Sequence, residues 1–213
     1  MSTFFTAKHD AESLKEQGGD YISKSGIYDV IIKFASVQKS PNGSMTVDFN
    51  VEYKGSSTTL YGLRLTNNDG SPNFQANLFN KLLVILGIDS VAEPTPEDHK
   101  VGKDQQVKTF SVLTELSDQE IKVRVQYSYS LWEGKIIEKR EIKNFYRVSD
   151  GATASEIEKG EDYGKQLSKD IPYSENTTYK DGLTEEDVKA FKEGKKVSVS
   201  TPTATKVANP FAS

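Results

Sequence analysis

Residues 121–146 read IKVRVQYSYSLWEGKIIEKREIKNFY, and this stretch decides the fold. As far as Leu131, apolar or aromatic residues alternate strictly with polar ones. A period of two, rich in β-branched and aromatic side chains, predicts a half-buried β-strand. Glu133-Gly134 then supplies the positive-φ position that a tight hairpin requires. We therefore predict a long two-stranded ribbon that turns at these two residues.

The predicted ribbon is locally basic. Residues 121–147 hold seven Lys or Arg and three acids, in a chain whose net charge is −4. Cations beside aromatic rings suit a nucleic-acid strand, because cations neutralise phosphates and rings stack on bases. A solvated outer face on an ordinary β-barrel hairpin explains the same pattern equally well.

Further strands and one helix are expected before the ribbon. Alternating or apolar runs predict strands at 26–37, 45–53, 58–65 and 107–116. Ser71 is a suitable N-cap, Pro72 suits the first helical position and Gly87 the C-terminal end. Phe74, Leu78, Leu82 and Ile85 repeat at helical spacing between them.

This order predicts a mainly β fold, an oligonucleotide-binding (OB) fold-like barrel of five to six strands with one helix inserted after the third strand. A β-sandwich with one inserted helix is the competing architecture. The expected domains are a mobile N-terminal arm (1–20), the OB-like domain (21–148), an acidic extension with a short helix capped by Thr184 (149–194), and a disordered C-terminal tail (195–213). Residues 89–106 are expected to form a polar connection.

Composition excludes several classes of function. The 213 residues include no cysteine and only two histidines, so neither a disulfide framework nor a metal site is expected. No apolar run approaches the roughly 20 residues of a membrane span, and the start lacks the apolar core of a signal peptide. We expect a soluble cytoplasmic protein without cofactor or membrane contact.

Catalysis is not expected either. The chain holds no G-x-S-x-G elbow, no P-loop and no G-x-G-x-x-G motif. Asp29 and Asp48 fall on adjacent predicted strands and could approach one another, but edge-strand solubility explains them at least as well. The sequence therefore favours a binding protein over an enzyme.

Several segments together resemble the small single-stranded DNA-binding proteins of tailed bacteriophages. These are Gly26–Ile32, the turn at Gly43, residues 77–88, the ribbon, and residues 148–157. The resemblance covers roughly residues 20–157, and no single motif in it is diagnostic. It implies an OB-type barrel that coats exposed single strands, with little sequence preference, during phage DNA replication, recombination and repair in the cytoplasm of the infected bacterial host.

The C-terminal part departs from that family. Many replicative members end in a strongly acidic tail that contacts partner proteins, whereas the last nineteen residues here hold no acid. Phe211 resembles the near-terminal aromatic residue of such tails. It is the expected contact for replication or recombination proteins, and an oligomer is left open.

The expected DNA-binding residues divide by chemistry. Cations that would track phosphates are Arg64, Lys122, Arg124, Lys139, Arg140 and Lys143. Rings that would stack on bases are Trp132, Tyr127, Tyr129, Tyr146 and Tyr61. Tyr127 and Tyr129 share a face with Val123 and Val125, so core packing is the rival interpretation for them. Two other functions remain open, an adaptor β-domain that docks a protein partner and a recombination mediator that anneals strands.

Overall fold

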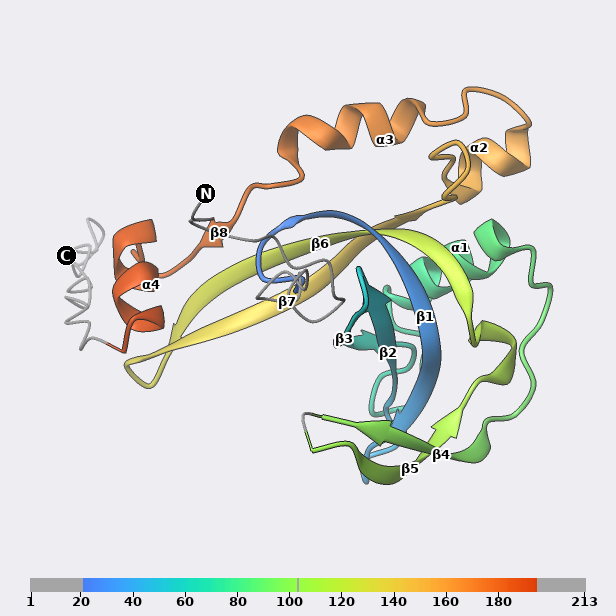
Figure 1. Cartoon of the computed structure of the whole chain (residues 1–213), viewed down its shortest axis with the longest axis horizontal. Coiled ribbons are helices and arrows are strands. Elements are labelled where there is room, and N and C mark those ends of the chain that lie inside the picture. Colours follow the sequence, from blue (N-terminus) through green and yellow to red (C-terminus); the bar gives the residue numbers. More distant parts are fainter. Residues whose placement is uncertain (1–20, 103, 195–213) are drawn as a thin grey trace, which may run out of the picture.

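The structure is a computed structural model that describes residues 21–102 and 104–194 (Figure 1). The described chain is mainly β, with one helix between the third strand and the later ones. The strands are β1 (Gly26–Lys39), β2 (Met45–Tyr53), β3 (Ser56–Arg64), β4 (Thr95–Val101), β5 (Gln106–Val112), β6 (Gln119–Trp132), β7 (Lys135–Tyr146) and β8 (Thr178–Tyr179). The helices are α1 (Ala76–Leu86), α2 (Ala154–Lys159), α3 (Lys165–Asp170) and α4 (Glu185–Lys192), with 3-10 turns at Thr114–Leu116 and Ile171–Tyr173.

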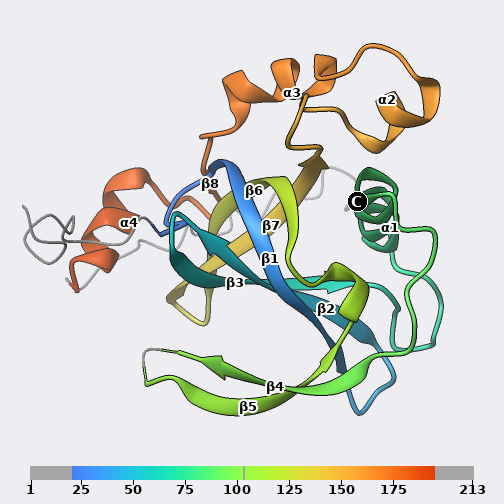
Figure 2. The ribbon, with the colours of Figure 1, turned by 45° about the vertical axis from the view of Figure 1, so that its right-hand side comes forward.

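Strand β1 organises the sheet. It pairs antiparallel with β6 along its first half and with β2 along its second half, and β3 and β7 continue the sheet beyond β2 and β6. The β4–β5 hairpin joins β1 through the Ser36–Val112 pair (Figure 2). Strands β3 and β7 are neighbours in space, but no ladder joins them within the described residues. The sheet is therefore open at this point.

The core lies between the inner faces of these strands. Every second residue of β6, from Ile121 to Tyr129, is almost fully buried, as the alternation in the sequence predicts. Helix α1 buries Phe79, Leu82 and Ile85 and lies against β3, β7 and α2. Apolar spacing in both elements thus produces one continuous core.

The predicted ribbon is confirmed. Strands β6 and β7 pair from Lys122–Tyr146 to Trp132–Lys135, and the ribbon projects away from α1 (Figure 1). Glu133 and Gly134 connect them with φ of 49° and 72°, the positive-φ turn that the sequence indicates. The three strands predicted before the helix correspond to β1, β2 and β3.

The start of the helix was predicted wrongly. Its N-cap is Gln75, not Ser71, and Pro72 lies in a loop where it bridges to Thr66. Ser71 is held outside the helix because its backbone N–H and hydroxyl both donate to Asp69. The predicted end is correct, since Gly87 adopts the left-handed conformation and caps the helix.

Two further segments differ from expectation. The polar connection predicted at 89–106 contains β4, and the strand predicted at 107–116 is β5 followed by a 3-10 turn. The predicted acidic extension holds α2, α3, β8 and α4, and the Thr184 cap of α4 is confirmed by its bond from Asp187 N (3.2 Å).

The predicted arm (1–20), the predicted tail (195–213) and Phe211 lie outside the described residues. In the part of the chain described, no helix has an apolar stretch long enough to cross a membrane.

Candidate nucleic-acid interface

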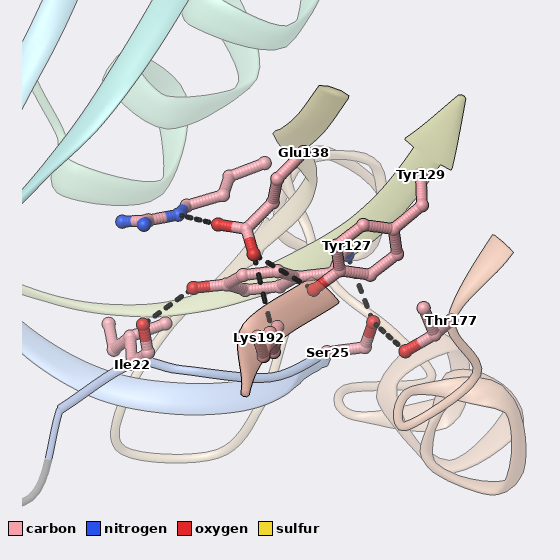
Figure 3. A network of polar contacts seen from close by, with 8 residues as sticks. Ile22, Ser25, Tyr127, Tyr129, Glu138, Thr177 and Lys192 are labelled. Carbon is pink, nitrogen blue, oxygen red and sulfur yellow. Dashed lines mark hydrogen bonds and ion pairs between the residues drawn. The ribbon is translucent and has the colours of Figure 1, made fainter. Parts of the chain in front are cut away.

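The inner face of the ribbon belongs to the core. Tyr127 and Tyr129 are 1% and 2% exposed. The Tyr127 hydroxyl donates to the Ile22 carbonyl (2.6 Å), and the Tyr129 hydroxyl donates to Glu138 Oε2 (2.9 Å) (Figure 3). Lys192 of α4 approaches both rings and lies 3.7 Å from the same Glu138 oxygen. Neither ring is open to a base in this conformation, so core packing describes these two tyrosines.

Burial and hydrogen bonds shift the pKa values of Tyr129 and Glu138 in this network. Burial, reinforced by the hydrogen bond to Glu138, raises the pKa of Tyr129. For Glu138, burial acts to raise the pKa, but donation from Tyr129 and Arg140 outweighs it and lowers the pKa. The neutral phenol and the ionised carboxylate therefore stabilise one another.

The outer face of β6 is covered by the C-terminal extension. Arg124 Nη1 lies 2.9 Å from Asp170 Oδ1, and the hydroxyl of the fully buried Tyr146 donates to the other oxygen of Asp170. Lys122 forms an ion pair with Asp29 of β1. Three of the residues expected to contact DNA are thus bonded to the protein's own carboxylates.

Strand β7 keeps its cations exposed. Lys139, Arg140 and Lys143 are all exposed. Arg140 Nε contacts Glu138 Oε1 at 3.1 Å, and Lys143 Nζ contacts Glu141 Oε2 at 2.5 Å. The Lys143–Glu141 pair is accessible to solvent on both sides, so a phosphate can replace its carboxylate at low cost. Glu138, which also accepts from Tyr129, holds Arg140 near the Tyr127 ring.

Strand β3 presents an exposed ring and an exposed cation. Tyr61 is 64% exposed, and the exposed Arg64 forms no ion pair with any described residue. A bulge at Gly62, with φ of 81°, interrupts the β2–β3 register, and Asp48 Oδ1 accepts a bond from Gly62 N (2.8 Å). The bulge therefore lies directly beside Tyr61.

Phe74 adds a second ring near Arg64. It is 79% exposed, and the adjacent Gln75 accepts a bond from Arg64 N through Oε1 (2.8 Å). Sequence reasoning placed Phe74 in the buried stripe of α1 because its spacing to Leu78 is helical. Asn73 could have indicated that Phe74 lies before the helix, because Asn side chains favour local bonds to the backbone over the helix interior. Here Asn73 Oδ1 accepts from Gln75 N (3.1 Å). We call Tyr61, Arg64 and Phe74 the β3 platform.

Trp132 lies at the free end of the ribbon. It is 68% exposed and directly precedes the Glu133-Gly134 turn. Single exposed apolar side chains are common on protein surfaces, so the exposure of this ring makes it available to a ligand without marking a contact surface. Trp132 therefore remains a candidate contact.

The structure does not pair carboxylates for acid–base chemistry at the place considered from sequence. Asp29 is bound to Lys122, and Asp48 is bound to Gly62 N, so each is occupied separately. Burial raises the pKa of Asp48, and the bond from Gly62 opposes this. Among the described residues no group of three or more His, Asp or Glu could hold a metal ion.

No model of a known protein family matches this chain, and no curated protein matches it. The candidate interface consequently stands on its own geometry. That geometry separates the eleven expected DNA contacts into two groups. The exposed ones are Tyr61, Arg64, Trp132, Lys139, Arg140 and Lys143. Those engaged within the protein are Lys122, Arg124, Tyr127, Tyr129 and Tyr146.

Proposed function

We propose that the chain is a single-stranded DNA-binding protein with little sequence preference, built on an OB-type barrel, that coats exposed strands during phage DNA replication and recombination. The order of the elements supports the barrel: three strands in series, one helix, and a later ribbon whose first strand returns to β1. The proximity of β3 and β7 is the place where such a barrel would close.

The observation that carries the proposal is the β3 platform. It combines an exposed guanidinium that forms no ion pair with the described residues and two rings that are mostly exposed to solvent. Rings accept any base by stacking, worth roughly 1–3 kcal/mol per base, and cations neutralise phosphates whatever the sequence. A surface of this kind binds unpaired strands because their bases are free to stack.

The remaining exposed residues extend this surface in the proposal. Lys139, Arg140 and Lys143 on β7 would contact phosphates, and Trp132 would stack at the end of the ribbon. Arg124 and Tyr146 would instead fix the C-terminal extension to the sheet, because both bind Asp170. The DNA-binding residues are therefore fewer than the sequence alone indicates.

Fluorescence and anisotropy titrations with a labelled dT oligomer test the proposal. Tyr61→Ala and Phe74→Ala should each weaken binding about tenfold, since one stacking contact is worth roughly 1.4 kcal/mol at the lower end of its range. The matched control is Tyr173→Ala, which removes a ring of similar exposure (62%) from the C-terminal extension. It should leave the affinity unchanged.

Two results would count against the proposal. If wild-type protein leaves the oligomer unbound even at low salt, the adaptor function becomes the better account of the exposed rings. If the control weakens binding as much as the platform variants do, the platform is not the stacking surface. Accelerated pairing of complementary oligomers would add strand annealing to the activity.

A further inference from the structure

A hollow of about 500 Å³ lies where α1, β7, α2 and α3 meet. Five lysines from these four elements line it, Lys81, Lys143, Lys159, Lys165 and Lys169. All five are exposed. Three acids line it as well, so the hollow carries an excess of positive charge.

Two of the three acids are already engaged. Glu156 accepts backbone bonds from Thr153 N and Gln166 N, both at 2.8 Å, one on each carboxylate oxygen. Asp162 is paired with Lys165 at 2.8 Å. Glu161 is the third acid of the lining. Glu156 and Asp162 thus stabilise the α2–α3 connection.

Three of the lysines have no such partner. Lys81, Lys159 and Lys169 form no ion pair with any residue between 21 and 194 that the structure describes. Two of these lysines affect a neighbouring carboxylate. The pKa of Asp162 is lowered first by its bond to Lys165 and further by the charges of Lys159 and Lys169. The ammonium groups therefore create a positive potential that the protein itself does not neutralise.

The hollow is continuous with the cations of β7. Lys143 lines it and is bonded to Glu141, whose pKa is lowered by Lys143 first and by Lys139 among its other neighbours. Lys139 and Lys143 therefore both lie close to Glu141, with Lys143 at the edge of the hollow. A phosphate chain that follows β7 from Lys139 reaches the hollow next.

We propose that this lysine hollow holds the phosphates of the bound nucleic-acid strand after it leaves β7. The inference rests on the proposed single-strand binding and extends it, because it adds a contact region on α1 and α2 that the sequence pattern did not indicate. Its ligand is the phosphodiester backbone alone, since lysine ammonium groups act as point charges without base selectivity.

Oligonucleotide length separates this region from the β3 platform. The test compares dT oligomers of about 6 nucleotides, near the lower end of the usual site of one OB fold, and about 20 nucleotides, longer than that site. The variant Lys81→Ala/Lys159→Ala should bind the short oligomer like wild type. For the long oligomer, the slope of log K against log salt should fall by about 1.4, because each lost phosphate contact on a single strand removes about 0.7.

Two matched variants complete the experiment. Lys100→Ala/Lys108→Ala removes two exposed lysines of the β4–β5 hairpin and should leave the slope unchanged. Lys81→Arg/Lys159→Arg keeps both charges and should restore the wild-type slope. An unchanged slope for the alanine variant, or an equal loss with both oligomer lengths, would overturn the lysine hollow while leaving the platform intact. Failure of wild type to bind either length would overturn the proposed function itself.

Discussion

Removing Asp170 should destabilise the protein strongly, because this one carboxylate satisfies two groups on the outer face of the sheet. It pairs with Arg124 and accepts from the Tyr146 hydroxyl. The side chains of Arg124 and Asp170 are only 18% and 15% exposed, so solvent screens their attraction weakly. Arg124 Nε is buried and has no hydrogen-bond partner among the described residues, so the ion pair already carries the cost of desolvation.

The expected size of the effect follows from this burial. Removing one member of a buried ion pair costs about 3 kcal/mol, at the lower end of the usual range, because α3 can separate from the sheet and admit water. Asp170→Ala should therefore lower the free energy of unfolding by about 3 kcal/mol. Replacing the ion pair alone by apolar residues would leave the buried Tyr146 hydroxyl without its acceptor. Arg124→Met/Tyr146→Phe/Asp170→Leu, which removes all three polar groups, should recover most of the loss.

Urea unfolding followed by circular dichroism measures these differences, and titration with dT oligomers completes the comparison. A loss below about 1 kcal/mol for Asp170→Ala would show a solvated, unimportant pair and would refute the reasoning. Arg124→Ala should leave the salt slope of DNA binding unchanged. A fall of about 0.7 in that slope would instead show that Arg124 contacts a phosphate.

Three further predictions concern the fold. Asp48→Ala should lower the free energy of unfolding, measured in urea, by about 1 kcal/mol, because Gly62 N loses its acceptor. Asp48→Asn keeps an acceptor and removes a charge that burial disfavours, so it should match wild type. Gly164→Ala should lower the free energy of unfolding, measured by thermal unfolding, by more than about 2 kcal/mol, because φ is 75° and the new Cβ would lie 2.6 Å from a carbonyl oxygen. Gly160 has a similar φ of 71° but open space around it, so Gly160→Ala should cost only about 1 kcal/mol. Burial raises the pKa of Tyr28 from 10.0 to about 12, so its neutral form is favoured in the folded state. The resulting stability should be complete below pH 10 and lost between pH 10 and about 12. Urea unfolding of wild type and Tyr28→Phe across this window checks it, and an equal loss of stability in both proteins would contradict it.

The ribbon and the meander before it were predictable because their information is local. The alternation along β6 indicates which face of the strand is buried, and Glu133-Gly134 indicates the turn. Neither prediction depends on any other segment. Strand β4 was missed because it is exposed or half-buried throughout and carries Pro96, Asp98 and Lys100. A strand of this kind has no apolar face for the sequence to reveal.

The interface was harder to predict because partners distant in sequence decide which charges remain free. Arg124 and Lys139 look alike in the sequence, yet Asp170 engages the first from 46 residues away and the second stays exposed. Phe74 was misplaced for the opposite reason, since a helical spacing continued past the true start of α1. Trp132 and Tyr61, which were expected to stack on bases, are both exposed.

The short strand β8 has a consequence for how copies of this chain behave toward one another. The ladder between β1 and β6 ends at Gly26–Val125, while β6 continues to Trp132. Beyond that point β8 pairs with Ser128 and Tyr129, and Asp181 accepts a bond from Leu131 N (2.9 Å). Without this cover the ribbon would offer a row of open backbone donors and acceptors, the usual template for intermolecular strand addition and aggregation. The C-terminal extension therefore also protects this edge of β6 from pairing with a second molecule.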